Sequence, residues 1–123
     1  MLGEYLGVKN GEFVINDAPY TVPVLEFNNW ESYNDREEYL AHGGRYPNDE
    51  LIGCAAAGFT TTVRDTKHMD FTDLPMFSPT LGRMLGSCER STEETMTTVN
   101  SLVLEFFNCY LKGEGVFTIQ DIY

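Results

Sequence analysis

Basic residues are scarce in this sequence. Eight Lys and Arg residues stand against nineteen Asp and Glu residues, which gives a formal net charge of −11. A chain with this excess of negative charge is repelled by phosphate backbones and by anionic membrane surfaces. We therefore expect neither nucleic acid nor a charged lipid surface among its partners.

Cysteine, histidine and long apolar runs are also scarce. The three cysteines lack C-x-x-C spacing and the two histidines form no H-E-x-x-H motif, so no disulfide framework, metal site or other cofactor is indicated. No apolar run reaches the roughly 18 residues that cross a membrane, and nothing at Met1 is typical of a signal peptide. We expect no membrane span and a reducing, cytoplasmic environment.

The order of predicted elements along the chain indicates an α/β fold. Apolar and β-branched residues gather at 21–27 and 59–65, which favours two strands. Two short helices are predicted between them, one capped by Ser32 or Asn34 and one at 49–57. A strand, a crossover of about thirty residues and a second strand are typical of a parallel βαβ unit with covering helices.

The clearest helix signal lies near the end of the chain. Ser91 and Glu94 have the spacing of a capping box, apolar residues then recur every three or four positions, and Gly113 ends the pattern. Ser78, followed by proline, predicts a short helix before this one. We expect the long carboxyl-terminal helix to cover the sheet.

Two flanking segments complete the predicted organisation. Residues 1–20 form a lead-in with a possible edge strand at 12–15, and residues 114–123 form a tail or a further edge strand. The main domain lies between them, at 21–113.

The loop after the second predicted strand carries a candidate catalytic base, His68. Loops at the carboxyl ends of parallel strands are where α/β proteins place their chemistry. This loop reads Lys67-His68-Met69-Asp70-Phe71-Thr72-Asp73-Leu74-Pro75, and the closing helix ends Phe106-Phe107-Asn108-Cys109-Tyr110-Leu111-Lys112-Gly113. Over roughly residues 22–113 the chain resembles the carboxyl-terminal part of α/β-hydrolases, with the platelet-activating-factor acetylhydrolase and dienelactone-hydrolase-like esterases as the closest branch.

The resemblance implies a partial α/β-hydrolase fold, with residues 21–113 as the carboxyl-terminal half of the hydrolase domain. It also implies serine-dependent hydrolysis of a carboxylic ester or a similar acyl substrate, with His68 similar to the triad histidine. The nucleophile is absent, because this family carries its serine in a G-x-S-x-G motif upstream of the histidine and the chain has no such motif. Ser87 and Cys54 are more typical of structural residues. We therefore expect the chain to be inactive alone and to meet its substrate only when an amino-terminal half completes the site.

The acid that would orient His68 has several candidates. By chain order it precedes the histidine, at Glu4, Asp17, Glu26 or Glu31. Glu31 follows the first predicted strand directly, which is the common position in the wider superfamily. Glu4 suits the acetylhydrolase-like branch, where the acid follows the nucleophile closely. Glu31 and Glu4 are therefore the two candidates for the acid.

Apolar residues follow His68 and are candidates for a pocket wall: Phe71, Leu74, Met76 and Phe77. Two other functional classes stay open. One is a non-catalytic module whose apolar surface binds a partner chain, and the other is a small-ligand-binding domain that uses this loop.

The predicted sheet is small for a parallel sheet. Such sheets usually have more than two strands and are covered on both faces. We therefore expect a homo-oligomer or a partner chain, or the recruitment of residues 13–15 and 116–119 as additional strands.

Overall fold

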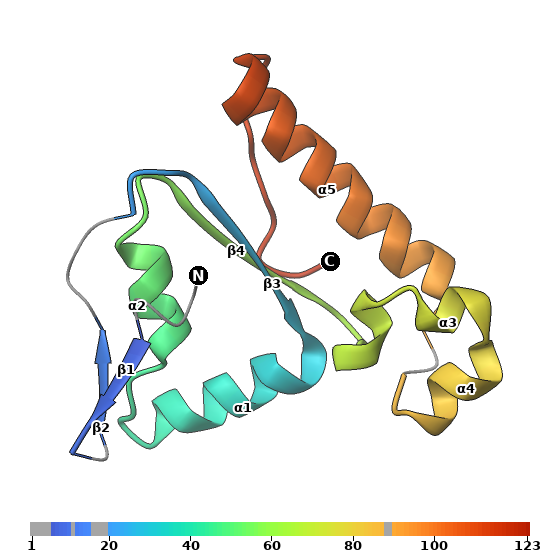
Figure 1. Cartoon of the computed structure of the whole chain (residues 1–123), viewed down its shortest axis with the longest axis horizontal. Coiled ribbons are helices and arrows are strands. Elements are labelled where there is room, and N and C mark those ends of the chain that lie inside the picture. Colours follow the sequence, from blue (N-terminus) through green and yellow to red (C-terminus); the bar gives the residue numbers. More distant parts are fainter. Residues whose placement is uncertain (1–5, 11, 16–19, 88–89) are drawn as a thin grey trace.

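A small parallel sheet lies at the centre of a mixed α/β structure (Figure 1). The computed structural model describes residues 6–10, 12–15, 20–87 and 90–123. Strand β3 (Val24–Asn29) pairs in parallel with β4 (Gly58–Val63), and Glu26 lies beside Thr60 in the register. The predicted parallel βαβ unit is therefore confirmed.

The first described residues form a separate two-stranded sheet. β1 (Leu6–Lys9) pairs antiparallel with β2 (Glu12–Ile15). The strand predicted at 12–15 therefore exists, but it pairs with β1 and does not join the β3–β4 sheet.

Helices α1 (Trp30–Ala41) and α2 (Pro47–Gly53) form the crossover between the parallel strands. The cap predicted at Ser32 or Asn34 is wrong: the side-chain oxygen of Asn29 accepts from the Ser32 N–H at 2.8 Å. The helix begins directly where the strand ends, so the last strand residue serves as its cap. α2 also begins and ends earlier than the predicted 49–57.

The carboxyl-terminal half is helical. A 3₁₀ turn η2 (His68–Phe71) precedes α3 (Leu74–Phe77), α4 (Pro79–Met84) and the long α5 (Thr92–Lys112). As predicted, Ser91 caps α5, and Gly113 ends it with a left-handed φ of 72°. None of the helices in the described part of the chain is long and apolar enough to span a bilayer.

Helices α5 and α1 lie on opposite sides of the β3–β4 sheet (Figure 1). On the α5 side, Phe59 packs against Phe106 and Phe117, with ring centroids 6.3 and 4.9 Å apart. Val63 and Leu102 are buried in the same layer. This aromatic contact confirms that the long helix covers the sheet.

The last residues of the chain pair with the outer edge of β4. Thr62 donates its N–H to the Asp121 carbonyl and accepts from the Tyr123 N–H, each at 2.9 Å, and the Arg64 N–H donates to the Tyr123 carbonyl at 2.8 Å. The tail therefore acts as an edge strand, but through residues near the end of the chain and not through 116–119, where Val116 is 87% exposed.

Candidate functional site

The loop that carries His68 leaves the carboxyl end of β4 and is tied to the start of α1. Asp65 turns the chain with a positive φ of 56°. The buried Thr66 donates its hydroxyl to the Val63 carbonyl at 2.6 Å, and its own carbonyl accepts from the Trp30 N–H at 3.0 Å. The carboxyl ends of the two parallel strands are thereby held together.

A buried carboxylate fixes the turn in which His68 lies. Asp70 is 3% exposed, and its Oδ2 accepts from the Lys67 N–H at 2.7 Å. The Asp70 N–H in turn donates to the Lys67 carbonyl at 3.0 Å. His68 is the first residue of η2 and is itself exposed. Its imidazole is therefore exposed to solvent on a turn whose backbone is fixed. A catalytic base needs such exposure if its nucleophile lies on another segment.

The residues that follow β3 lie at the same edge of the sheet. The Trp30 ring stacks on Tyr33 with centroids 5.2 Å apart, and the Arg64 guanidinium lies 5.0 Å from the centre of the Trp30 ring. Glu31, the candidate acid, is exposed in the first turn of α1. In the described part of the chain no hydrogen bond or ion pair joins Glu31 to His68.

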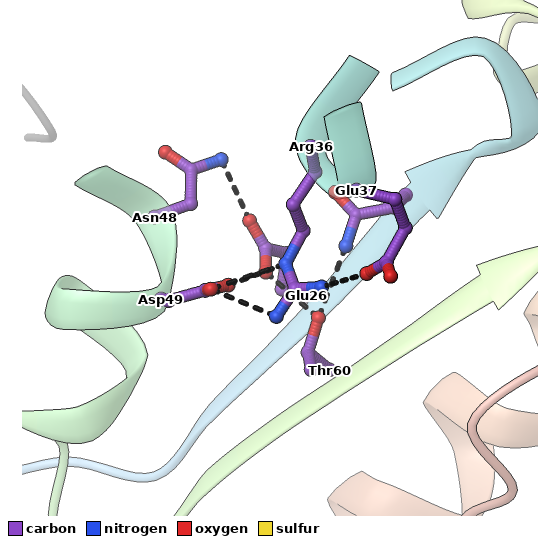
Figure 2. A network of polar contacts seen from close by, with 7 residues as sticks. Glu26, Arg36, Glu37, Asn48, Asp49 and Thr60 are labelled. Atoms are coloured by element: carbon purple, nitrogen blue, oxygen red, sulfur yellow. Dashed lines mark hydrogen bonds and ion pairs between the residues drawn. The ribbon is translucent and has the colours of Figure 1, made fainter. Parts of the chain in front are cut away.

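Glu4 and Asp17 lie outside the described residues. Glu26 points into a polar cluster between β3 and α2, where it is bonded to Asn48 and Thr60 (Figure 2). Cys54 caps the carboxyl end of α2, and the Ser87 N–H donates to the Gly82 carbonyl just after α4, so both occupy ordinary positions at helix ends.

The apolar residues after His68 form an uneven surface. Phe71 and Leu74 are half-buried, whereas Met76 and Phe77 are 59% and 85% exposed. The pocket wall that these four residues were expected to form stays a prediction. Within this chain they present an apolar surface beside the histidine.

A polar cluster covers the sheet face opposite α5, and the sequence analysis did not predict it (Figure 2). The Glu26 carboxylate accepts from Asn48 Nδ2 and from the Thr60 hydroxyl, each at 2.8 Å. The Thr60 hydroxyl accepts in turn from Asn28 Nδ2 at 3.0 Å. The available signal was the alternation of Glu26 and Asn28 along a strand, which places both on one face.

Arg36 joins the helices of this cluster. Its Nε and Nη2 donate to the two oxygens of Asp49 at 2.9 and 2.8 Å, and its Nη1 pairs with Glu37. The hydrogen bonds to Asp49 raise the pKa of Arg36. Burial raises the pKa of Tyr46, and the charges of Glu26 and Asp49 add to the effect.

Two cavities flank β3. One, of about 260 Å³, is largely apolar and is lined by Tyr20, Val24, Leu25, Glu26, Asn48, Leu51 and Ile52. The other, of about 290 Å³, is more polar and is lined by Asn28, Tyr33, Arg36, Glu37, Thr60, Thr61, Thr62 and Asp121. His68 lines neither.

The described residues contain no cluster of side chains that could bind a metal ion. Within residues 6–10, 12–15, 20–87 and 90–123, no three side chains of His, Cys, Asp or Glu are placed to hold one ion.

Comparison of the chain with models of known protein families, with curated proteins and with solved structures finds no match.

Proposed function

We propose that this chain supplies the base histidine of a serine-dependent hydrolase whose nucleophile lies on another segment of polypeptide. The observation that carries the proposal is the placement of His68, exposed on a turn that Asp70 fixes, at the carboxyl ends of two parallel strands. The sequence resemblance to the esterase branch of α/β-hydrolases supports the same role. The substrate class is a carboxylic ester or a similar acyl compound.

His68 takes the hydroxyl proton of the serine as the serine attacks the acyl carbon, and returns it to the leaving group as the carbon–oxygen bond breaks. The exposed Glu31, in the first turn of α1, is the acid that this chain itself offers. The completing segment contributes the serine and the backbone amides that stabilise the oxyanion.

A second candidate function is a non-catalytic interaction module, and one observation favours it. On the outer face of α5, Leu104, Phe107 and Leu111 are 60%, 47% and 77% exposed and recur at helical spacing. A surface of this kind is typical of contact with another protein, with or without catalysis.

Covalent labelling tests whether the isolated chain carries its own nucleophile. A fluorophosphonate probe reacts with an activated serine, so the intact mass of this chain is expected to stay unchanged after incubation. An adduct that a single serine substitution abolishes would show that the chain carries its own nucleophile. That result would overturn the proposal that the nucleophile lies on another segment. The coding sequence upstream of Met1 is the place to look for an in-frame G-x-S-x-G.

A further inference from the structure

The edge of β3 that faces away from β4 is open in the part of the chain that the structure describes. β4 is the only strand paired with β3 there, and the tail occupies the other edge of β4. The Val24 N–H points toward β4, since it donates to the Ala57 carbonyl at 2.9 Å. Successive backbone groups of a strand point to opposite edges, so the N–H groups of Leu25 and Phe27 point to the open edge.

The apolar cavity runs along this same edge. Three consecutive residues of β3, Val24 to Glu26, line it, although their side chains alternate between the two faces of the sheet. Among the described residues, none of β4 lines the cavity, so it lies on the side of β3 that faces away from β4. Leu51 and Ile52 of α2 form its apolar wall. Its volume of about 260 Å³ leaves room for an aliphatic side chain.

The surroundings of the cavity are negatively charged. From Thr21 to Gly58 the chain has seven acidic side chains against two arginines. Both arginines are already paired, Arg36 with Asp49 and Arg45 with Glu50. A partner at this edge is therefore favoured if it carries positive charge, and a second copy of this acidic chain is disfavoured.

We propose that the open edge of β3 binds an extended, basic segment of another polypeptide as an added strand. The backbone of that segment pairs with Leu25 and Phe27, and one of its aliphatic side chains enters the cavity beside Leu51 and Ile52. Backbone pairing supplies affinity, while the cavity and the acidic surroundings select the sequence. The inference goes beyond the role of His68 and does not need it, because the cavity flanks the amino-terminal half of β3 and His68 lies past the carboxyl end of β4.

Nuclear magnetic resonance of the full chain, titrated with a short peptide of alternating valine and lysine, tests the proposal. We expect saturable shifts at β3 and at the cavity-lining residues, with slowed amide exchange at Leu25 and Phe27. The same peptide with glutamate in place of lysine is expected to bind about tenfold more weakly or worse. Equal binding of both peptides, shifts confined to other surfaces, or no saturation would each overturn the proposal.

Paired variants test the backbone contact. Leu25→Pro removes an N–H that has no strand partner in the described part of the chain, whereas Leu25→Ala truncates the side chain and keeps the N–H. We expect Leu25→Pro to bind the lysine peptide about tenfold more weakly than Leu25→Ala, and the two variants to bind equally if the edge is not used. Ile52→Trp fills the cavity and is expected to weaken binding to a similar extent, while an unchanged affinity would contradict the cavity's role.

A second copy is distinguished by sedimentation of the chain without peptide. Self-association that Leu25→Pro abolishes and Leu25→Ala preserves would make a second copy the occupant of the edge, and would overturn the basic segment proposed here. Thermal unfolding of each variant establishes that it is folded before its binding is compared.

Discussion

Asp70 is the residue on which the presentation of His68 depends. Its carboxylate is buried and accepts from the Lys67 N–H, so the turn begins with a charge-assisted hydrogen bond. His68 itself is exposed, and its position depends on the backbone of this turn. The sequence phrase around His68 pointed to the histidine, but a buried Asp two residues later follows only from the three-dimensional packing.

Removing this acceptor is expected to loosen the turn. Asp70→Ala should lower the free energy of unfolding by about 1–3 kcal/mol, because the Lys67 N–H loses its side-chain partner and the site is buried. The exposed Asp73, whose side chain makes no capping hydrogen bond, provides the control, since Asp73→Ala is expected to change stability by less than about 0.5 kcal/mol. Urea denaturation measures both. Equal effects of the two substitutions would contradict the role given to Asp70.

Tyr46 reports on the polar cluster through its ionisation. Burial and the nearby acids raise its pKa in the folded chain above the ordinary value of about 10. The folded state therefore holds this proton more tightly than the unfolded state, so the contribution to stability is present below pH 10 and is lost as the pH rises beyond it. Tyr46→Phe is expected to flatten the alkaline fall in stability, as measured by unfolding between pH 8 and 11. If stability depends on pH in the same way with Tyr46→Phe, this would contradict the raised pKa of Tyr46.

Among the helices and strands, α5 begins and ends at residues whose own side chain or backbone conformation determines the boundary. The Ser91 hydroxyl accepts from the Glu94 N–H at 3.4 Å, and Gly113 adopts the left-handed conformation that ends the helix. Ser91→Ala is expected to lower the free energy of unfolding by about 0.5–1 kcal/mol, toward the low end for a cap because the bond is long and exposed. Ser101→Ala, on the exposed surface in the middle of the helix, is the control and should be neutral or slightly stabilising. A lower melting temperature for Ser101→Ala than for Ser91→Ala would contradict the capping role of Ser91.

Local signals explain which elements the sequence predicted. Caps, apolar periodicity and β-branched runs predicted α5, β3 and β4, because each depends on neighbouring residues. The cap of α1 was misplaced because Asn29 is at once the last residue of a strand and the first cap of a helix. The cluster around Glu26, Arg36 and Asp49 joins three elements across the crossover, so the local alternation of Glu26 and Asn28 could place two polar residues on one face but could not predict their partners (Figure 2).

In the whole molecule, the tail pairs along the β4 edge of the β3–β4 sheet, and the β3 edge has no strand partner in the described part of the chain. Deleting residues 121–123 removes the three backbone hydrogen bonds that join Asp121 and Tyr123 to Thr62 and Arg64. We expect a loss of roughly 1.5–4.5 kcal/mol in the free energy of unfolding, and greater aggregation because a second strand edge is exposed. Val116→Ser, at an 87% exposed position of the same tail, should leave both properties nearly unchanged. Urea denaturation and light scattering test this, and a deletion as stable as the full chain would contradict the edge-strand role.

Large apolar side chains are exposed on helices α3 and α5. Leu104, Phe107 and Leu111 on α5 and Phe77 on α3 remain outside the core. The homo-oligomer or partner chain expected from the sequence stays a prediction, and the completing segment proposed for the hydrolase would be one such partner.

The central claim is that His68 acts as the base for a serine on another segment. The most direct measurement is the ester hydrolysis rate of this chain joined to the polypeptide that an upstream in-frame G-x-S-x-G would encode, with the exposed His42 as the matched control. We expect the joined protein to hydrolyse an activated ester, His68→Ala to lower kcat by about 10³-fold or more, and His42→Ala to leave it unchanged. Activity that survives His68→Ala, or falls equally in both variants, would contradict the claim.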